Sequence, residues 1–327
     1  MDVLGAEQDY GAIAVAGGGK IVAAVPTAPS GGGHDRLGVV RLTAAGLPDP
    51  SFGGGDGKLA VDFGKAFDPY AMVALPNGKL LVSGELYPKP ADSEFLVARL
   101  LPKGTLDHSF GGGDGFVTTQ FGAFNDGAWR MAVDPTGRIV ADGWAGESGT
   151  SYDLAVARYL SNGSPDHSFS GDGKLRLQVL EGADDYAYGL GLAGSKVIAG
   201  LHIQNGSALE VGLARFLPSG ALDPSFGGGD GEVILPSTAP GPDLRDIDVD
   251  AAGRVVALVG TGSPKQFELV RILPSGRVDH GFGANGFSDP TSFANDASPE
   301  RVSIGQHGNI VAVGGSEGDV AVARWVG

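Results

Sequence analysis

The sequence predicts an all-β fold, a six-bladed β-propeller with four antiparallel strands in each blade. The first observation is a recurring stretch, LDPSFGGGDG and its variants, whose Phe falls at positions 52, 110, 169, 226 and 282. The second is an apolar run ending in Arg, which occurs six times, at positions 41, 99, 158, 215, 271 and 324. The third is a Gly-Lys-like turn before a β-branched run, again in six copies. A fixed period of this length is typical of repeat architectures.

Each repeat contains four short stretches of strand-like composition between Gly, Pro, Asn and Asp turns. In the second repeat they cover residues 71–75, 80–84, 95–101 and 116–121. The turn at Asn77 and Gly78 predicts a β-hairpin, because Asn-Gly readily adopts the positive φ angles of a primed turn. No helical periodicity extends beyond one turn. Four strands in each of six repeats indicate a six-bladed propeller.

The two ends of the chain predict how the ring closes. The sixth copy stops after its third strand, at residues 321–326, whereas Met1–Gly5 matches the stretches that follow GGGDG elsewhere. We therefore expect residues 1–5 to form the outer strand of the last blade and to close the ring, which removes exposed sheet edges. The expected blades of this single domain cover approximately residues 9–63, 68–121, 126–179, 185–237, 243–292, and 297–327 with 1–5.

Composition limits the kinds of partner. The 327 residues include 57 Gly and no Cys, so disulfides and thiolate chemistry are excluded. A formal charge of −15 would repel phosphate backbones, so nucleic acid is not an expected partner. No segment approaches the roughly 18 apolar residues of a membrane span. We expect a monomer that is secreted or located in the cell envelope after leader removal, because the chain begins where the closing strand must begin. A cytoplasmic location is the alternative.

One family resemblance is carried by these repeats. The pattern DxAxxxxPxGKIVxxG, followed by DxAVARLLPxGxLDxSFGGDG, resembles the delta-60 repeat family of bacterial proteins over essentially the whole chain. The match is close in the second, third and fourth blades and looser in the others. The resemblance implies a propeller-like repeat, commonly on secreted or envelope-associated proteins. It implies no catalytic residue, because structural positions define the repeat.

Residues present in every blade are expected to build the blade. The recurrent Arg and the Asp of DxSF lie eight residues apart, which predicts an Arg–Asp pair within each blade. The marker Phe should fill the gap between neighbouring blades. The later acids of the motif, Asp56, Asp114, Asp172 and Asp230, favour Asx-turn capping over calcium binding, because one Asp among glycines supplies few of the six to eight oxygens that calcium needs.

Function is expected where the copies differ, around the mouth of the central channel. The start of the innermost strand and the exit of the second strand vary from blade to blade. The predicted ligand-binding residues there are Tyr70, Trp129, Arg130, Trp144, Tyr188, Arg245, Glu300 and Arg301. Rings beside hydrogen-bonding charges suit a carbohydrate or another polar, ring-bearing small molecule. The alternative is that the rings fill gaps between blades and the charges are solvated.

Asp248 is the most unusual acid. At its row of the innermost strand the other blades carry small residues, so its pKa is expected to be perturbed. The catalytic candidates are Asp248, Asp246, His202 and Glu85, and the metal candidates are Asp142, His202, Asp246 and Asp248. The sequence contains no catalytic or phosphate-binding motif. It therefore favours a ligand-binding or scaffold propeller without an assigned cofactor. The alternative is a metal-assisted hydrolase or lyase at the same mouth, using calcium or a similar divalent cation.

Overall fold

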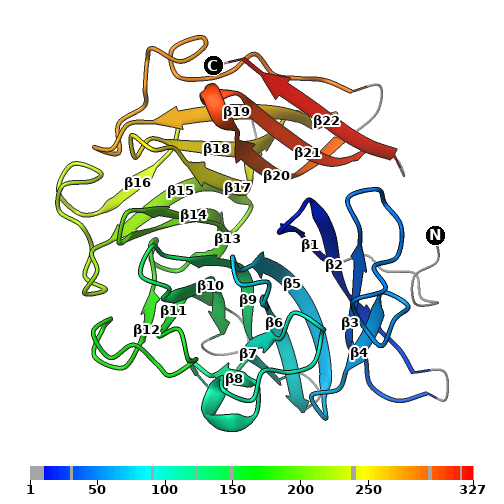
Figure 1. The fold of residues 1–327 in the computed structure, drawn as a ribbon. Helices are drawn as coiled ribbons and strands as arrows, with labels where there is room; N and C mark the ends of the chain where they lie inside the picture. The colour runs from blue at the N-terminus through cyan, green and yellow to red at the C-terminus, as the bar shows by residue number, and fades with distance from the viewer. Residues whose placement is uncertain are drawn as a thin grey trace. The chain divides into compact units, whose positions relative to one another are not determined.

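The computed structural model describes residues 11–29, 32–89, 92–122, 124–146, 151–236, 241–293, 297–316 and 319–326. The fold is a six-bladed, all-β propeller, and Figure 1 shows the strands of each blade. Over these residues only two short 3₁₀ turns occur besides strands, η1 (Gly111–Gly113) and η2 (Gln306–Gly308). The closing strand predicted at residues 1–5 lies outside the described residues. No described helix is long and apolar enough to cross a bilayer.

The chain divides into two compact units, which are described separately. Unit 1 contains residues 1–150, 155–167 and 172–174, and unit 2 contains residues 151–154, 168–171 and 175–327. Blades 1 and 2 and most of blade 3 belong to unit 1, and blades 4 to 6 belong to unit 2.

The first three blades are four-stranded antiparallel sheets in which neighbours in sequence are neighbours in the sheet. Their strands are β1 (Ala12–Ala16), β2 (Lys20–Thr27), β3 (Arg36–Leu42), β4 (Lys58–Val61), β5 (Ala66–Ala74), β6 (Leu80–Lys89), β7 (Asp92–Leu100), β8 (Phe116–Thr119), β9 (Asp126–Val133), β10 (Ile139–Gly146), β11 (Tyr152–Tyr159) and β12 (Lys174–Leu177).

Blade 4 is also four-stranded, whereas blades 5 and 6 have three described strands each. Their strands are β13 (Asp184–Ala193), β14 (Lys196–Asn205), β15 (Ala208–Phe216), β16 (Glu232–Ile234), β17 (Asp243–Val249), β18 (Val255–Thr261), β19 (Gln266–Ile272), β20 (Ala297–Ile304), β21 (Ile310–Ser316) and β22 (Asp319–Trp325). The outer strands of blades 1 to 4 are short and leave little edge for other chains to pair with.

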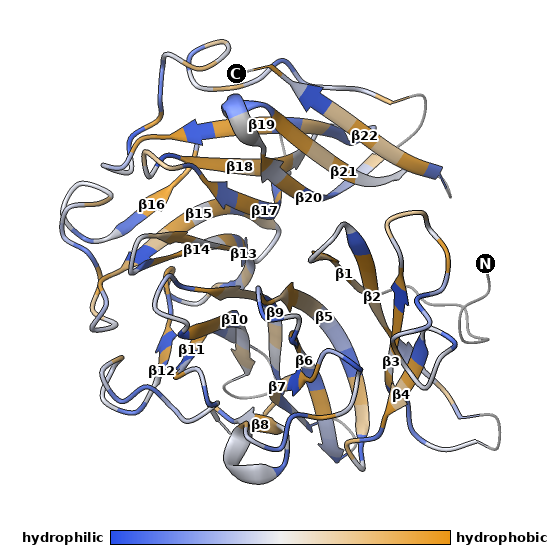
Figure 2. Cartoon of the chain, in the orientation of Figure 1, coloured by the Kyte–Doolittle hydropathy of each residue, from blue (hydrophilic) through white to orange (hydrophobic). Residues whose placement is uncertain are grey.

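The core lies between blades. One apolar cluster joins blades 1 and 2, and others join blades 2 and 3, blades 4 and 5, and blades 5 and 6. Figure 2 shows the matching pattern, with apolar residues concentrated on the strands and polar residues on the connections. The marker Phe residues at 52, 110, 226 and 282 are members of these clusters, and Phe169 is also fully buried. The prediction that this ring fills the gap between blades is confirmed.

The predicted Arg–Asp pair is present in all five blades that carry the motif. In each, Nε of the Arg donates to Oδ2 of the Asp at 2.7 to 2.8 Å, as in Arg41–Asp49 and Arg158–Asp166. In four blades the same guanidinium also lies 4.4 to 4.6 Å from the centre of the marker Phe ring. The repeated ion pair and ring therefore form one packed group at this end of the blade.

The motif loop also reaches the next blade. The backbone N–H of Gly53 donates to the carbonyl of Lys103 at 3.1 Å, and that of Gly227 donates to Ser275 at 3.1 Å. Nη1 of Arg41 donates to the Pro102 carbonyl at 2.6 Å, which again crosses from blade 1 to blade 2. In blades 1 to 4 the motif loop thus binds each blade to its successor. We call this side of a blade, with the DxSFGGGDG loop and the Gly-Lys turn, the motif end.

The later Asp of the motif closes an Asx turn. Oδ1 of Asp56 accepts the N–H of Lys58 at 3.0 Å, and Asp172 and Asp230 make the same contact at 3.1 Å. The predicted Asx-turn capping is therefore confirmed for these three positions.

Candidate functional site

Each innermost strand carries a β-bulge near its start in blades 2 to 6. The register between the first and second strands shifts at the same row each time, so one inner-strand residue is extra. These extra residues, here called the bulge residues, are Tyr70, Trp129, Tyr188, Arg245 and Glu300. All five were predicted as ligand-binding residues because they vary between repeats. A bulge re-aims a side chain away from the regular sheet faces, and bulges are frequent beside functional sites.

In unit 1, three predicted rings come together at this bulge end, opposite the motif end. The ring centres of Tyr70 and Trp129 are 4.5 Å apart, those of Trp129 and Trp144 are 5.5 Å apart, and those of Tyr70 and Trp144 are 6.4 Å apart. The two indoles are half-buried, whereas Tyr70 is buried. We call these three residues the aromatic group. Partly exposed indole faces offer an apolar surface with a polar edge.

Hydrogen bonds hold Tyr70 in the aromatic group. Its hydroxyl donates to Glu85 Oε2 at 3.1 Å, and Ser93 donates to the other carboxylate oxygen at 2.6 Å. Burial raises the pKa of Glu85, although these hydrogen bonds act in the opposite direction. Asp68 lies opposite Glu85 on the neighbouring strand and accepts a hydrogen bond from Tyr87 at 3.0 Å. Burial likewise raises the pKa of Asp68. Two carboxyl groups with raised pKa values thus lie opposite each other on β5 and β6, and one of them, Glu85, contacts the aromatic group.

Arg130 and Asp142 lie behind the same group. They are opposite residues of β9 and β10, and both are buried. The Arg130 guanidinium carbon is 5.6 Å from the centre of the Trp129 ring, close enough for a cation–π contact. Among the described residues no three His, Asp or Glu side chains could together hold a metal ion. The four metal candidates therefore do not form such a group there.

In unit 2, the bulge end of blade 4 carries a row of rings. Tyr188 lies 5.7 Å from the His202 ring and 6.0 Å from Tyr186, whose ring plane is within 9° of parallel. Tyr152 extends the row, 5.2 Å from Tyr186. Tyr152 and Tyr186 were not predicted from the sequence. Tyr186 could have been found from its position two residues before Tyr188, since alternate strand residues share a face.

Next to these rings, in blade 5, Asp243 contacts three basic side chains. Its Oδ2 lies 2.7 Å from Arg245 Nη2 and 2.7 Å from Lys265 Nζ, and its Oδ1 lies 3.2 Å from His202 Nδ1. Burial would raise the pKa of Asp243, but the His202 contact and the charges of Arg245 and Lys265 hold it well below its ordinary value. Lys265 was not predicted, because it lies in a different hairpin connection and belongs to no motif.

Two further acids at the start of innermost strands, Asp126 and Asp185, cap loops. Oδ2 of Asp126 accepts the N–H of Phe121 at 2.7 Å, and Oδ2 of Asp185 accepts those of Val179 at 2.6 Å and Leu180 at 3.3 Å. Burial raises the pKa of Asp185 to about 6, since these two hydrogen bonds only partly offset it.

Asp246 and Asp248 connect blade 5 to blade 6. Oδ2 of Asp246 accepts the N–H of Val302 at 3.0 Å, and Oδ2 of Asp248 accepts that of Ile304 at 2.7 Å. Asp248 occupies the same register row as Val73 of blade 2 and Ser303 of blade 6, as predicted. Burial raises its pKa, so the predicted perturbation is confirmed. Both carboxylates accept hydrogen bonds from the backbone of the next inner strand, so they stabilise the packing of the two blades.

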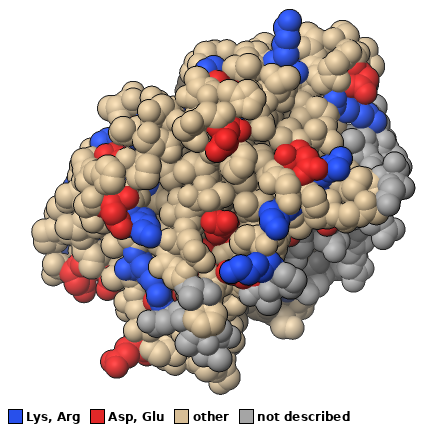
Figure 3. All heavy atoms as spheres, turned by 90° about the horizontal axis from the view of Figure 1, so that it is seen from below, with Lys and Arg blue, Asp and Glu red and all other residues tan. Residues whose placement is uncertain are grey.

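Glu300 and Arg301 are the least enclosed of the predicted residues. Glu300 is exposed, and Arg301 is half-buried with its Nη1 donating to the Glu300 carbonyl at 3.1 Å. Figure 3 shows one face of the molecule, where acidic and basic side chains frequently lie side by side.

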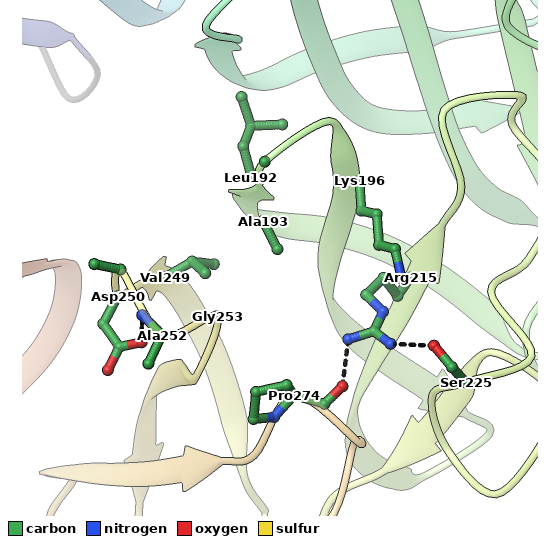
Figure 4. Close-up of a pocket in the computed structure, with 12 residues that line it drawn as sticks. Leu192, Ala193, Lys196, Arg215, Ser225, Val249, Asp250, Ala252, Gly253 and Pro274 are labelled. Atoms are coloured by element: carbon green, nitrogen blue, oxygen red, sulfur yellow. Dashed lines mark hydrogen bonds between the residues drawn. The ribbon is translucent and has the colours of Figure 1, made fainter.

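The motif end also has pockets, but they recur between blades. Figure 4 shows the one between blades 4 and 5, of about 630 Å³, with Lys196, Arg215 and Pro274 on its wall. Arg215 donates to the Pro274 carbonyl at 2.5 Å and to Ser225 at 3.0 Å, and Lys196 pairs with Asp223 at 2.7 Å. A pocket of the same volume with the corresponding residues lies between blades 2 and 3. These pockets are consequences of the repeat, so the bulge end is the better candidate for a specific site.

Comparison with known proteins agrees with the repeat architecture. Residues 19–52, 75–110, 135–169 and 196–226 match a family model described as "Domain of unknown function (DUF5122) beta-propeller". The chain is similar to this β-propeller repeat family. No curated protein sequence matches the chain.

Several solved structures share the fold. An α-L-arabinanase from Penicillium chrysogenum, complexed with arabinobiose, has a TM-score of 0.54 and 10% identity, covering 99% of this chain and 95% of that chain. The PQQ-bound aldose sugar dehydrogenase from Streptomyces coelicolor has a TM-score of 0.54 and 14% identity, covering 98% and 95%. A protein of unknown function from Dyadobacter fermentans has a TM-score of 0.53 and 12% identity, covering 98% and 96%. At identities this low, the likeness shows a shared fold and carries no information about shared chemistry.

Proposed function

We propose that this propeller binds a carbohydrate, or a similar polar, ring-bearing small molecule, through the aromatic group Tyr70, Trp129 and Trp144. One observation carries the proposal: Tyr70 and Trp129 are bulge residues and Trp144 lies at the exit of a second strand, so the repeat requires none of these rings, yet all three meet at one place. Dispersion contacts between indole faces and the C–H groups of a sugar ring would supply the affinity, with nearby hydroxyl and guanidinium groups binding sugar hydroxyls.

An α-L-arabinanase complexed with arabinobiose and an aldose sugar dehydrogenase share the propeller fold, so this fold is compatible with a carbohydrate site. We further propose that the repeat is of the delta-60 type and that the protein is secreted or located in the envelope. Fractionation of cells that express the natural gene would test the location, since recovery with cytoplasmic enzymes would contradict it.

The three tryptophans of the chain allow a direct binding test. Trp325 lies in blade 6, so a Trp325→Phe variant leaves only the two indoles of the aromatic group as fluorescent reporters. Titration with neutral oligosaccharides, including arabinobiose, should shift or quench this fluorescence saturably. Trp129→Ala in the same background should weaken binding by about tenfold or more, because one stacking surface is lost. If no oligosaccharide in a broad panel changes the fluorescence, the proposal is wrong.

A second candidate, hydrolysis of the bound sugar, is favoured by Glu85. This carboxyl group accepts a hydrogen bond from Tyr70, and burial raises its pKa, as expected of a general acid. Glu85→Gln should then abolish product formation and leave binding to the aromatic group within a few-fold of wild type. A wild type that binds a sugar without cleaving it would rule out hydrolysis and leave the binding proposal intact.

A further inference from the structure

We propose that the bulge end of blades 4 and 5 forms a second binding site, which recognises a carboxylate-bearing sugar such as a uronic acid. This site lies within unit 2, is built from different residues and takes a different class of ligand from the aromatic group. It does not depend on the function proposed above.

The site is formed by two neighbouring inner strands. A side chain added at Gly189 of β13 would come within 2.8 Å of the Ile247 backbone nitrogen of β17, which shows how closely these strands pack. Their bulge residues, Tyr188 and Arg245, occupy the same register row. One strand therefore presents a ring and the next presents a guanidinium at the same level.

The charges at this place favour an anion. Arg245 and Lys265 both contact Asp243 at 2.7 Å, so two permanent cations share one carboxylate. Because the pKa of Asp243 is held low, the three groups together carry one net positive charge at neutral pH, in a chain whose formal charge is −15. About a quarter of the Arg245 side chain and a third of the Lys265 side chain remain accessible, at 26% and 34%. Asp243 thus fixes the direction of two partly accessible cations.

The shape of the charged groups selects among anions. A guanidinium is planar and matches the two oxygens of a carboxylate, and an ammonium alongside adds a second charge-assisted hydrogen bond. The His202 ring lies 3.2 Å from Asp243 and 5.7 Å from the Tyr188 ring, so aromatic surface continues directly from the cations. A ligand that combines a carboxylate with a flat, C–H-rich ring would contact both surfaces. Acidic sugars have this combination.

The acids near this site bind backbone groups or are buried. Asp184 accepts the backbone N–H of Tyr152 at 3.0 Å, and Glu268 is buried with 2% exposure. Asp246 accepts the backbone N–H of Val302 in blade 6. Arg245 and Lys265 are the partly accessible cations of the site.

Calorimetric titration of the purified chain with three probes tests this inference. The probes are digalacturonate, its methyl ester, which lacks the charge, and inorganic phosphate. We expect digalacturonate to bind at least about tenfold more tightly than the ester, because charge-assisted hydrogen bonds to the carboxylate are lost in the ester. Equal binding of acid and ester would overturn the proposal, and phosphate binding as tight as that of digalacturonate would show an anion site without sugar recognition.

Variants locate the site and separate it from the aromatic group. Arg245→Met and Lys265→Met should each weaken digalacturonate binding about tenfold or more, and the partly exposed Lys265 keeps the test valid if the other variant fails to fold. Arg254→Met is the matched control, since Arg254 pairs with Asp250 at 2.6 Å at the opposite end of the same strands. Trp129→Ala should leave digalacturonate binding unchanged. The assignment would be contradicted if both control variants lost digalacturonate binding. It would also be contradicted if Arg245→Met and Lys265→Met both bound digalacturonate as tightly as wild type.

Discussion

The two ends of each blade follow opposite rules. At the motif end, the same Arg, Asp and Phe recur in five blades with nearly identical Arg–Asp distances, and in blades 1 to 4 the loop donates a backbone hydrogen bond to the following blade. At the bulge end, the backbone deviation recurs in blades 2 to 6, but its residue changes from Tyr to Trp, Tyr, Arg and Glu. Repetition of a side chain therefore indicates architecture, and repetition of a backbone feature with changing side chains indicates where specificity can vary.

The difference has a physical origin. The motif end joins one blade to the next in blades 1 to 4, and the same set of contacts is used each time. The bulge end supplies fewer of the contacts between blades, so its residues can differ without loss of the fold. Blade 5 is an exception, because its Asp246 and Asp248 accept hydrogen bonds from the backbone of blade 6.

The largest expected effect is a loss of folding stability, which should differ between two copies of the motif-end ion pair. Arg158→Met removes the 2.8 Å contact to buried Asp166, while Arg138 lies 3.9 Å from that carboxylate and pairs with Asp134 at 2.6 Å, and the variant should cost roughly 3–5 kcal/mol. Arg215→Met should cost less, roughly 1–3 kcal/mol, because Lys196 still contacts Asp223 at 2.7 Å. Urea unfolding of both variants measures the difference. Equal losses would show that the second cation does not compensate.

Much of this end could be predicted from the sequence. The eight-residue spacing of Arg41 and Asp49 recurs in each repeat, so one physical argument covered five copies. The bulge residues could be singled out because they vary, although the bulge itself has no sequence signal. The partners of Asp243 and Asp248 could not be predicted, since Lys265 lies 22 residues from Asp243 and Ile304 lies 56 residues from Asp248. Such contacts depend on how strands align in space, and no motif encodes them.

A second prediction compares adjacent glycines of one motif loop. Gly111 and Gly112 both have positive φ, at 62° and 76°, but only at Gly111 would an added side chain overlap the Phe116 carbonyl. Gly112→Ala should cost only about 1–2 kcal/mol, the usual penalty for a left-handed residue with a side chain. Gly111→Ala should cost at least about 3 kcal/mol, because the backbone must also move. Thermal unfolding of the pair tests whether the repeated loop is closely packed against the backbone of Phe116, the first residue of β8 in the same blade.

The smallest effect concerns the bulge end. Because the pKa of Asp185 is raised from 3.8 to about 6, the native state holds its proton more readily than the unfolded chain, and this group lowers the unfolding free energy as pH rises from about 4 to about 6. Asp185→Asn removes the charge and keeps an oxygen for the N–H groups of Val179 and Leu180. It should therefore raise stability at pH 7 by on the order of 1–3 kcal/mol, with no gain at pH 4.

Unfolding across this pH range checks the prediction. Asp172→Asn is the control, because Asp172 is an exposed Asx-turn residue at the motif end and Asn forms the same turn. A gain from Asp185→Asn that is equally large at pH 4 and pH 7 would contradict the charge-based explanation.

The most direct test of the central claim measures stability and binding together at both ends. In the Trp325→Phe background, Trp129→Ala should weaken carbohydrate binding about tenfold or more and change the unfolding free energy far less than Arg158→Met does. Arg215→Met should lower stability and leave the affinity unchanged. If Arg215→Met weakens binding while Trp129→Ala does not, the assignment of architecture to the motif end and of ligand binding to the bulge end is wrong.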